Sequence, residues 1–178
     1  SGEDDISYFI YNPGWGTIYY KESEFGANAA ICDHHFTYGY FVFGAVVLAT
    51  YDKEFYNDYK DMIDMLIRDY ANPVKDEEYC RFRAYDLYEG HSWAGGYADN
   101  DSGNNQESAS ESLFSWVSMY LWGVLTENDT YRDAGVFGFT NEMEAVKQYW
   151  FDYDGDNWVE AWPYDVVAQV YGGINFYG

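Results

Sequence analysis

The sequence predicts an all-α fold in which the helices form part of an α/α toroid, with an inner and an outer layer. The evidence is an alternation along the chain. Residues 34–51 and about 105–125 are apolar on nearly every side, whereas residues 52–71 and 130–150 each carry one apolar and one polar face. A helix without a polar face is expected to be covered all round, and an amphipathic helix to border solvent. A simple bundle would give every helix a polar face, so two concentric layers fit better.

Residues 1–31 are expected to form a short hairpin or an irregular extended cover on this domain. Two β-prone runs, Ile6–Tyr11 and Thr17–Tyr20, flank a turn at Pro13-Gly14. Asp33 then fits an N-cap, and it predicts the start of the first helix without a polar face.

Asp52 is the predicted N-cap of the amphipathic helix that follows. That helix should end at Asn72-Pro73, because a residue before proline avoids the helical conformation. Residues 73–104 then form a long connection, and loops of this length in a compact domain are usually functional. Asn104 or Asn105 is expected to cap the third helix. A last short helix is expected at about 163–171.

Composition excludes several classes of partner. The chain has 178 residues, enough for a single domain, and a formal net charge of -22. Such acidity excludes nucleic acids and anionic membrane surfaces, because phosphate binding needs clustered Lys and Arg. Aromatic residues make up 22% of the chain; most are expected in the core, and some could stack on sugar rings. Cys32 and Cys80 could form one disulfide or remain two buried thiols, and the thiols are favoured.

Three carboxylates are the candidate catalytic groups. Glu107 and Glu111 are four residues apart, so on a helix they would share a face, and like charges raise the pKa of at least one carboxyl group. Asp33 begins the other fully apolar helix, and parallel inner helices would place all three at one end. Glycoside hydrolysis commonly uses such carboxyl pairs. We expect Asp33 to be the general acid, Glu107 the general base, and Glu111 to orient the water or exchange roles with Glu107. The alternative is that Asp33 only caps a helix and the glutamates only form a polar face.

No metal site is expected. His34, His35 and His91 could together bind zinc, but the adjacent pair would point to different faces of a helix. His91 is expected instead to bind a sugar hydroxyl or a catalytic carboxylate. The acidic run Asp152–Asn157 fails the EF-hand calcium pattern, because Gly155 stands fourth rather than sixth.

Three blocks of the sequence resemble the signature of glycoside hydrolase family 81, the inverting endo-β-1,3-glucanases, in the same order. The blocks are Asp33–Tyr40 (DHHFTYGY), Tyr88–Gly96 (YEGHSWAGG) and Asn105–Glu111 (NQESASE). The resemblance extends from about Tyr11 to Gly173.

The resemblance implies an (α/α)6 barrel, β-1,3-glucan as substrate, usually secretion, and no cofactor. It matches the family's acid to Asp33 and its base to Glu107 or Glu111. Thr37 stands where many members have histidine, so a histidine contact there is lost or made otherwise. The blocks also supply the residues expected to bind sugar: His34, Tyr38, Tyr88, His91, Trp93 and Asn105.

The chain is shorter than the resemblance requires. A complete barrel of ~17-residue helices and ~5-residue loops needs roughly 260 residues, so residues 1–178 are expected to be part of a barrel. The rest could lie on another chain, have been cut away, or be absent in a minimal form. An incomplete toroid would expose apolar surface and associate. The alternative function is a non-catalytic glucan-binding or self-assembling module.

Overall fold

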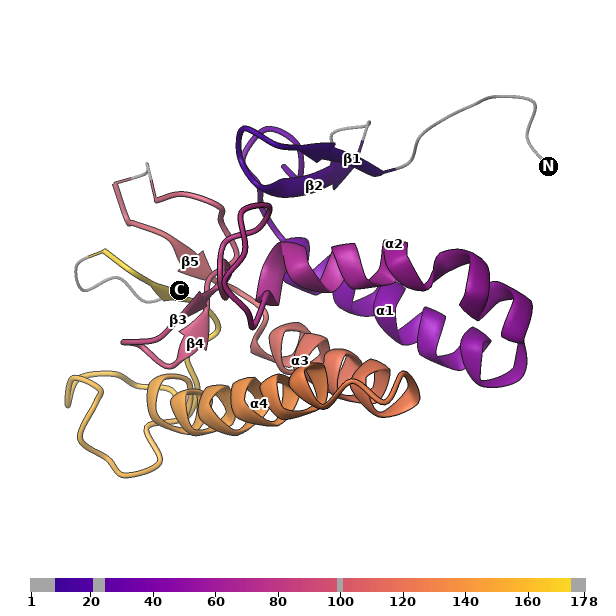
Figure 1. The fold of residues 1–178 in the computed structure, drawn as a ribbon. Helices are drawn as coiled ribbons and strands as arrows, with labels where there is room; N and C mark the ends of the chain where they lie inside the picture. The colour runs from indigo at the N-terminus through magenta and orange to yellow at the C-terminus, as the bar shows by residue number, and fades with distance from the viewer. Residues whose placement is uncertain (1–8, 21–24, 99–100, 174–178) are drawn as a thin grey trace.

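The structure, a computed structural model, describes residues 9–20, 25–98 and 101–173, and within these ranges it is mostly helical (Figure 1). Residues 6–8 of the first β-prone run lie outside them. The four helices and six short strands of the described ranges are β1 (Phe9–Asn12), β2 (Thr17–Tyr20), α1 (His34–Tyr51), α2 (Lys53–Ala71), β3 (Tyr85–Asp86), β4 (His91–Ser92), β5 (Asn105–Gln106), α3 (Ala109–Leu125), α4 (Asp129–Tyr149) and β6 (Val170–Tyr171).

The helices pack in the order α2, α1, α3, α4. α1 contacts both α2 and α3, and α3 contacts α4, so α1 and α3 are central and α2 and α4 flank them. The strands form three antiparallel pairs, β1 with β2, β3 with β4 and β5 with β6. In Figure 1 the pairs β3–β4 and β5–β6 gather at the end where α1 and α3 begin. At that end the three sequence blocks that resemble the family signature meet.

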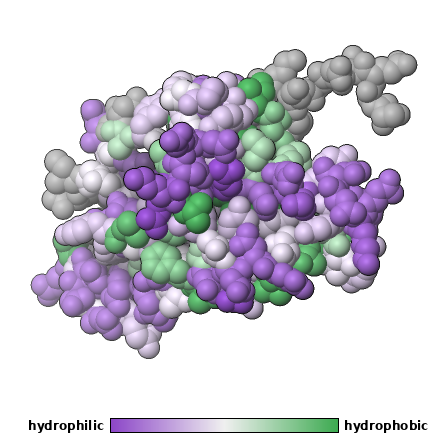
Figure 2. Space-filling model, viewed as in Figure 1, coloured by the Kyte–Doolittle hydropathy of each residue, from purple (hydrophilic) through white to green (hydrophobic). Residues whose placement is uncertain are grey.

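The prediction that α1 is buried on every side was wrong for this chain, although α1 is a central helix. Its exposed large side chains include Tyr40, Phe41, Val47, Leu48 and Tyr51, the last 88% exposed. α3 likewise exposes Tyr120 and Val124. On the face seen in Figure 2, hydrophilic residues prevail and hydrophobic ones emerge in separate patches.

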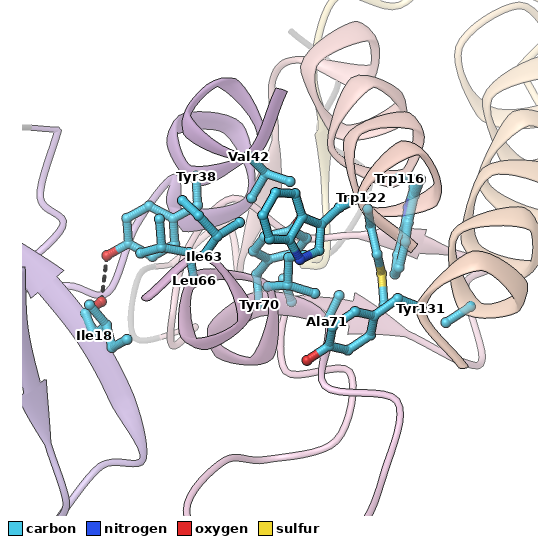
Figure 3. Packing of buried hydrophobic residues seen from close by; sticks show 14 of the residues in the cluster. Ile18, Tyr38, Val42, Ile63, Leu66, Tyr70, Ala71, Trp116, Trp122 and Tyr131 are labelled. Atoms are coloured by element: carbon cyan, nitrogen blue, oxygen red, sulfur yellow. Dashed lines mark hydrogen bonds between the residues drawn. The ribbon is translucent and has the colours of Figure 1, made fainter. Parts of the chain in front are cut away.

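The buried core lies where the helices face one another (Figure 3). Tyr38 and Val42 of α1, Leu66 and Tyr70 of α2, and the two tryptophans of α3, Trp116 and Trp122, are almost fully buried. Glycines allow the helices to approach closely: a Cβ at Gly135 would lie 2.7 Å from the backbone nitrogen of Tyr120. α3 and α4 are therefore in near backbone contact.

Three helix boundaries were predicted correctly. α1 begins at His34 directly after Asp33. Asp52 caps α2, because its side chain accepts hydrogen bonds from the backbone N–H groups of Glu54 and Phe55 at 2.9 and 3.0 Å. α2 ends at the residue before Asn72-Pro73, as expected.

Three local predictions were wrong. The N-cap of α3 is Ser108 rather than Asn104 or Asn105, because those residues belong to the preceding loop and to β5. The helix expected at 163–171 is absent from the described chain, and Val170–Tyr171 is instead the strand β6 paired with β5. Cys32 and Cys80, both among the described residues, are not bonded to each other, as favoured, but they are half-buried and exposed rather than buried.

Candidate active site

Asp33 stands at the entrance of α1 in an unusual backbone conformation. Its φ of 58° is left-handed, a region that non-glycine residues seldom adopt. Its carboxylate makes no capping hydrogen bond with the described part of the helix, so the side chain is not committed to ending α1. The position of Asp33 is fixed through its backbone instead.

The three sequence blocks are joined at Ala94. The N–H of Asp33 donates to the carbonyl of Ala94 at 2.8 Å, and the N–H of Ala94 donates to the carbonyl of Asn105 at 2.7 Å. The amide side chain of Asn104 holds the same loop by bonding both the N–H and the carbonyl of Gly95, each at 2.9 Å. The backbone leading to Glu107 is therefore tied to that of Asp33.

Asp33, Glu107 and Glu111 line one pocket of about 400 Å³, which we call the carboxylate pocket. Its other lining residues are Phe25, Phe36, Thr37 and Tyr40. The two glutamates do not share a helix face as predicted, because Glu107 precedes the cap of α3 and only Glu111 lies in its first turn. They reach the same pocket from an extended segment and from the helix.

The electrostatics of the carboxylate pocket favour a protonated Asp33. Burial, together with the charges of Glu107 and Glu111, raises the pKa of Asp33 to about 6, against a smaller opposing effect of His34. Glu111 also accepts a hydrogen bond from the Tyr40 hydroxyl, and this bond raises the pKa of Tyr40. The pocket thus holds one carboxyl group that keeps its proton up to about pH 6, beside two other carboxyl groups.

The side chain of Gln106, the residue before Glu107 of the carboxylate pocket, is fully buried. The side-chain amide of Gln106 donates to the carbonyl of Ser92 at 2.6 Å and lies 3.2 Å from Nε2 of His35. Burial lowers the pKa of His35 to about 3, helped by the nearby charge of Arg83 and by His34. His35 is therefore neutral, and its Nε2 can accept from Gln106, which fixes the residue before Glu107.

Glu142 of α4 forms hydrogen bonds that hold the loop containing Ser92 in place. It is 0% exposed, and its carboxylate accepts hydrogen bonds from Ser92 N–H, the Ser92 hydroxyl, the Ser112 hydroxyl and the Trp116 indole N–H. Because each oxygen receives one N–H group, which can only donate, both oxygens act as acceptors. Through Ser92 this carboxylate connects α4 and α3 to Gln106.

Comparison with known proteins identifies the family. The sequence profile of the glycosyl hydrolase family 81 C-terminal domain matches residues 5–177, almost the whole chain. The chain belongs to glycoside hydrolase family 81.

Relatives of this family 81 chain carry consistent names. It is 40% identical over 168 residues to a glucan endo-1,3-beta-D-glucosidase of Acetivibrio thermocellus, covering 93% of this chain and 22% of that protein. A protein of the same name from Thermobifida fusca is 36% identical, with 96% and 23% covered. The structure of a mutant family 81 glycoside hydrolase from Clostridium thermocellum superimposes with a TM-score of 0.88 at 39% identity, covering 93% and 23%. The chain spans less than a quarter of the length of these relatives.

Two residues expected to bind sugar in this family 81 chain are buried in structural roles. His34 is 2% exposed, with Nδ1 2.7 Å from the Asp69 carboxylate and Nε2 2.8 Å from the carbonyl of Ala27. Tyr38 is 0% exposed, and its hydroxyl donates to the carbonyl of Ile18 (Figure 3). Their polar atoms are engaged inside the protein, so this geometry contradicts a direct sugar contact.

Asp69, which holds His34, is a second buried carboxylate; neither it nor Glu142 was among the site residues predicted from the sequence. Burial alone would raise its pKa, but the charges of Arg83 and His34 and their hydrogen bonding lower it overall. Asp69 also accepts from the N–H of Ile18 at 2.7 Å. It therefore joins the β1–β2 hairpin, α1 and the long connection.

The other expected sugar-binding residues are spread along the same end of the molecule. Tyr88 is 92% exposed, and Asn105 belongs to β5. His91 and Trp93 line a second pocket rather than the carboxylate pocket. Among the described residues, no group of three or more His, Cys, Asp or Glu side chains could hold a metal ion. None of the helices described here has the length and apolarity to cross a bilayer.

Proposed function

We propose that this chain carries the acid–base centre of an enzyme that cleaves β-1,3-glucan internally and with inversion. The observation that carries the proposal is the carboxylate pocket, where burial and two neighbouring carboxylates raise the pKa of Asp33 to about 6. The substrate class follows the relatives, which are named glucan endo-1,3-beta-D-glucosidases. Secretion, which the family resemblance implies, stays a prediction.

In the proposed reaction Asp33 donates its proton to the oxygen of the scissile linkage. Glu107, which is exposed and precedes α3, takes a proton from water. That water attacks the anomeric carbon from the opposite side as the bond to the departing sugar breaks. Glu111, held by the Tyr40 hydroxyl, orients the water. The cycle ends with Asp33 ionised and Glu107 protonated, and solvent exchange restores both.

We also propose that the four helices form one arc of an (α/α)6 toroid within a single catalytic domain. The support is the alternation of central helices α1 and α3 with flanking helices α2 and α4. Apolar side chains left exposed on α1, such as Val47 and Leu48, would be covered by the neighbouring helices of the ring. Those helices would come from a longer form of this chain or from another chain.

Hydrolysis of laminarin tests the proposed function. We expect reducing ends to be released by the chain, and Asp33→Asn and Glu107→Gln each to lower the rate by about 10²–10⁴-fold. The matched controls Asp156→Asn and Glu144→Gln replace exposed acids outside the pocket and should leave the rate unchanged. Proton NMR of fresh products should show the α-anomer first.

Full activity of Asp33→Asn, or products that are β at first, would contradict the acid–base assignment. A chain that binds laminarin without releasing reducing ends would instead support the non-catalytic binding module.

A further inference from the structure

A second pocket, of about 290 Å³, opens between the long connection, the end of α4 and β6. Its walls are largely aromatic, and three polar side chains lie among them. The aromatic residues are Trp93, Tyr149, Trp158 and Tyr171, and the polar residues are Glu89, His91 and Asn157. We call this the aromatic pocket. Its volume lies near the lower end of the range of small-molecule sites, ~300–1,000 Å³, so it suits one or two rings rather than a long ligand.

The aromatic walls are fixed in the protein before any ligand arrives. The indole N–H of Trp93 donates to Asp86 at 3.0 Å, and that of Trp158 donates to the carbonyl of Tyr149 at 3.0 Å. The Tyr149 hydroxyl is hydrogen-bonded to Glu89. Because these side chains are already ordered, a ligand would pay little of the usual entropy cost of arranging them.

Glycine keeps one side of the aromatic pocket open. A Cβ at Gly172 would lie 3.4 Å from the six-membered ring of Trp93. That is ordinary van der Waals contact, so a side chain at this position would touch the indole. The bare backbone of Gly172 and Gly173 lines the pocket instead, which leaves the ring accessible from that side.

The aromatic pocket lies close to the carboxylate pocket through the β5–β6 pair. Tyr171 is the pairing partner of Asn105, and Glu107 follows Asn105 by two residues. Two extended residues and one strand spacing limit the distance between the Cα atoms of Tyr171 and Glu107 to about 12 Å. The backbone segments that line the two pockets are therefore separated by no more than the length of a short oligosaccharide.

We propose that the aromatic pocket is a sugar-binding subsite that holds a glucosyl residue of the same glucan chain whose linkage is cleaved between Asp33 and Glu107. The inference rests on the proposed function. The apolar faces of a pyranose ring pack on indole and phenol rings, and its hydroxyls can bond the carboxylate of Glu89 and the amide of Asn157. An ammonium ligand is the main rival, because aromatic rings beside a carboxylate also attract cations.

Titration calorimetry on the Asp33→Asn chain, which should not hydrolyse its ligand, tests the subsite with laminarihexaose as the probe. Adding Trp158→Ala should raise the Kd about tenfold, which corresponds to about 1.4 kcal/mol. Trp158→Phe should recover part of the loss, and Glu89→Gln should also weaken binding. Tyr153→Ala removes an exposed aromatic residue from the same loop region, outside the pocket, and should leave the Kd unchanged. Choline is titrated in parallel.

The outcomes separate this inference from the proposed function. If Trp158→Ala and Glu89→Gln bind the hexaose as tightly as their parent, the subsite is wrong even though Asp33→Asn abolishes hydrolysis. If choline binds and the hexaose does not, the pocket is a cation site. If Trp158→Ala fails to fold, Trp158→Phe and Glu89→Gln decide. Loss of hydrolysis in Asp33→Asn is measured separately on laminarin, so failure of the catalytic proposal is recognised by itself.

Discussion

Replacing Glu142 by glutamine tests whether this buried carboxylate holds the loops of the candidate active site in place. Oε1 of Glu142 accepts from Ser92 N–H and the Ser112 hydroxyl, and Oε2 accepts from the Ser92 hydroxyl and the Trp116 indole N–H. Each oxygen therefore receives one hydroxyl and one N–H group. A hydroxyl can rotate to accept from an amide NH₂, whereas an N–H group cannot.

The amide of glutamine consequently strands one N–H donor whichever way it is oriented. A buried unsatisfied donor costs ~1–3 kcal/mol, and bonds to a charged acceptor are worth ~1.5–3 kcal/mol against ~0.5–1.5 kcal/mol for neutral ones. Glutamine avoids the cost of burying a charge, which offsets part of this loss. We expect Glu142→Gln to lower the free energy of unfolding by about 2–3 kcal/mol.

Urea denaturation followed by circular dichroism measures this change. Glu144→Gln is the matched control on the same helix, because Glu144 is exposed and its ion pair with Lys147 should contribute under ~0.5 kcal/mol. Since Ser92 also holds Gln106, laminarin hydrolysis should fall along with stability in Glu142→Gln. A loss below about 1 kcal/mol would refute the reasoning, because no stranded donor would then be present.

The remaining predictions concern pH and helix packing. Burial and the neighbouring carboxylates raise the folded pKa of Asp33 from its ordinary value of 3.8 to about 6, so stability present below the unfolded pKa is lost as pH rises through about 6. Asp33→Asn should therefore melt at a higher temperature than its parent at pH 8 and at no higher temperature at pH 3.5. An equal difference at both pH values would contradict this. Gly135→Ala, which places a Cβ 2.7 Å from the Tyr120 backbone, should destabilise the fold by ~1–3 kcal/mol in urea denaturation. Its control Gly44→Ala, whose Cβ would meet no described atom within 4 Å, should instead gain ~0.5–1 kcal/mol from helix propensity, and a loss there would contradict the packing argument.

The helices were predictable because their ends are encoded locally. Asp52 and the Asn72-Pro73 pair lie beside the residues that they cap or terminate. The start of α3 could not be predicted locally, because the amide of Asn104 bonds Gly95, a residue of the preceding loop, rather than a helix N–H. The strand at Val170–Tyr171 could not be predicted either, because its partner, β5, lies far upstream, and such pairing overrides local propensity.

The sequence allowed the prediction that the three acidic residues lie together, but not the buried residues that hold the surrounding loops in place. Asp33, Glu107 and Glu111 do line one pocket, although the helical spacing used to relate the two glutamates was wrong. Glu142 had a usable signal, since it lies on the same face of α4 as Phe139 and Val146, three residues before it and four after it. A carboxylate on an apolar face indicates a buried hydrogen-bonded group.

The left-handed backbone of Asp33 restricts which residues could ever replace it. That region is tolerated by glycine and, among residues with side chains, mainly by asparagine and aspartate. Glycine and asparagine satisfy the backbone but cannot donate a carboxylic proton. Glutamate could donate one but is poorly suited to the conformation and carries its carboxyl group one carbon further into the pocket. An engineer who wished to alter the acid at this position would have to rebuild the entrance of α1 first.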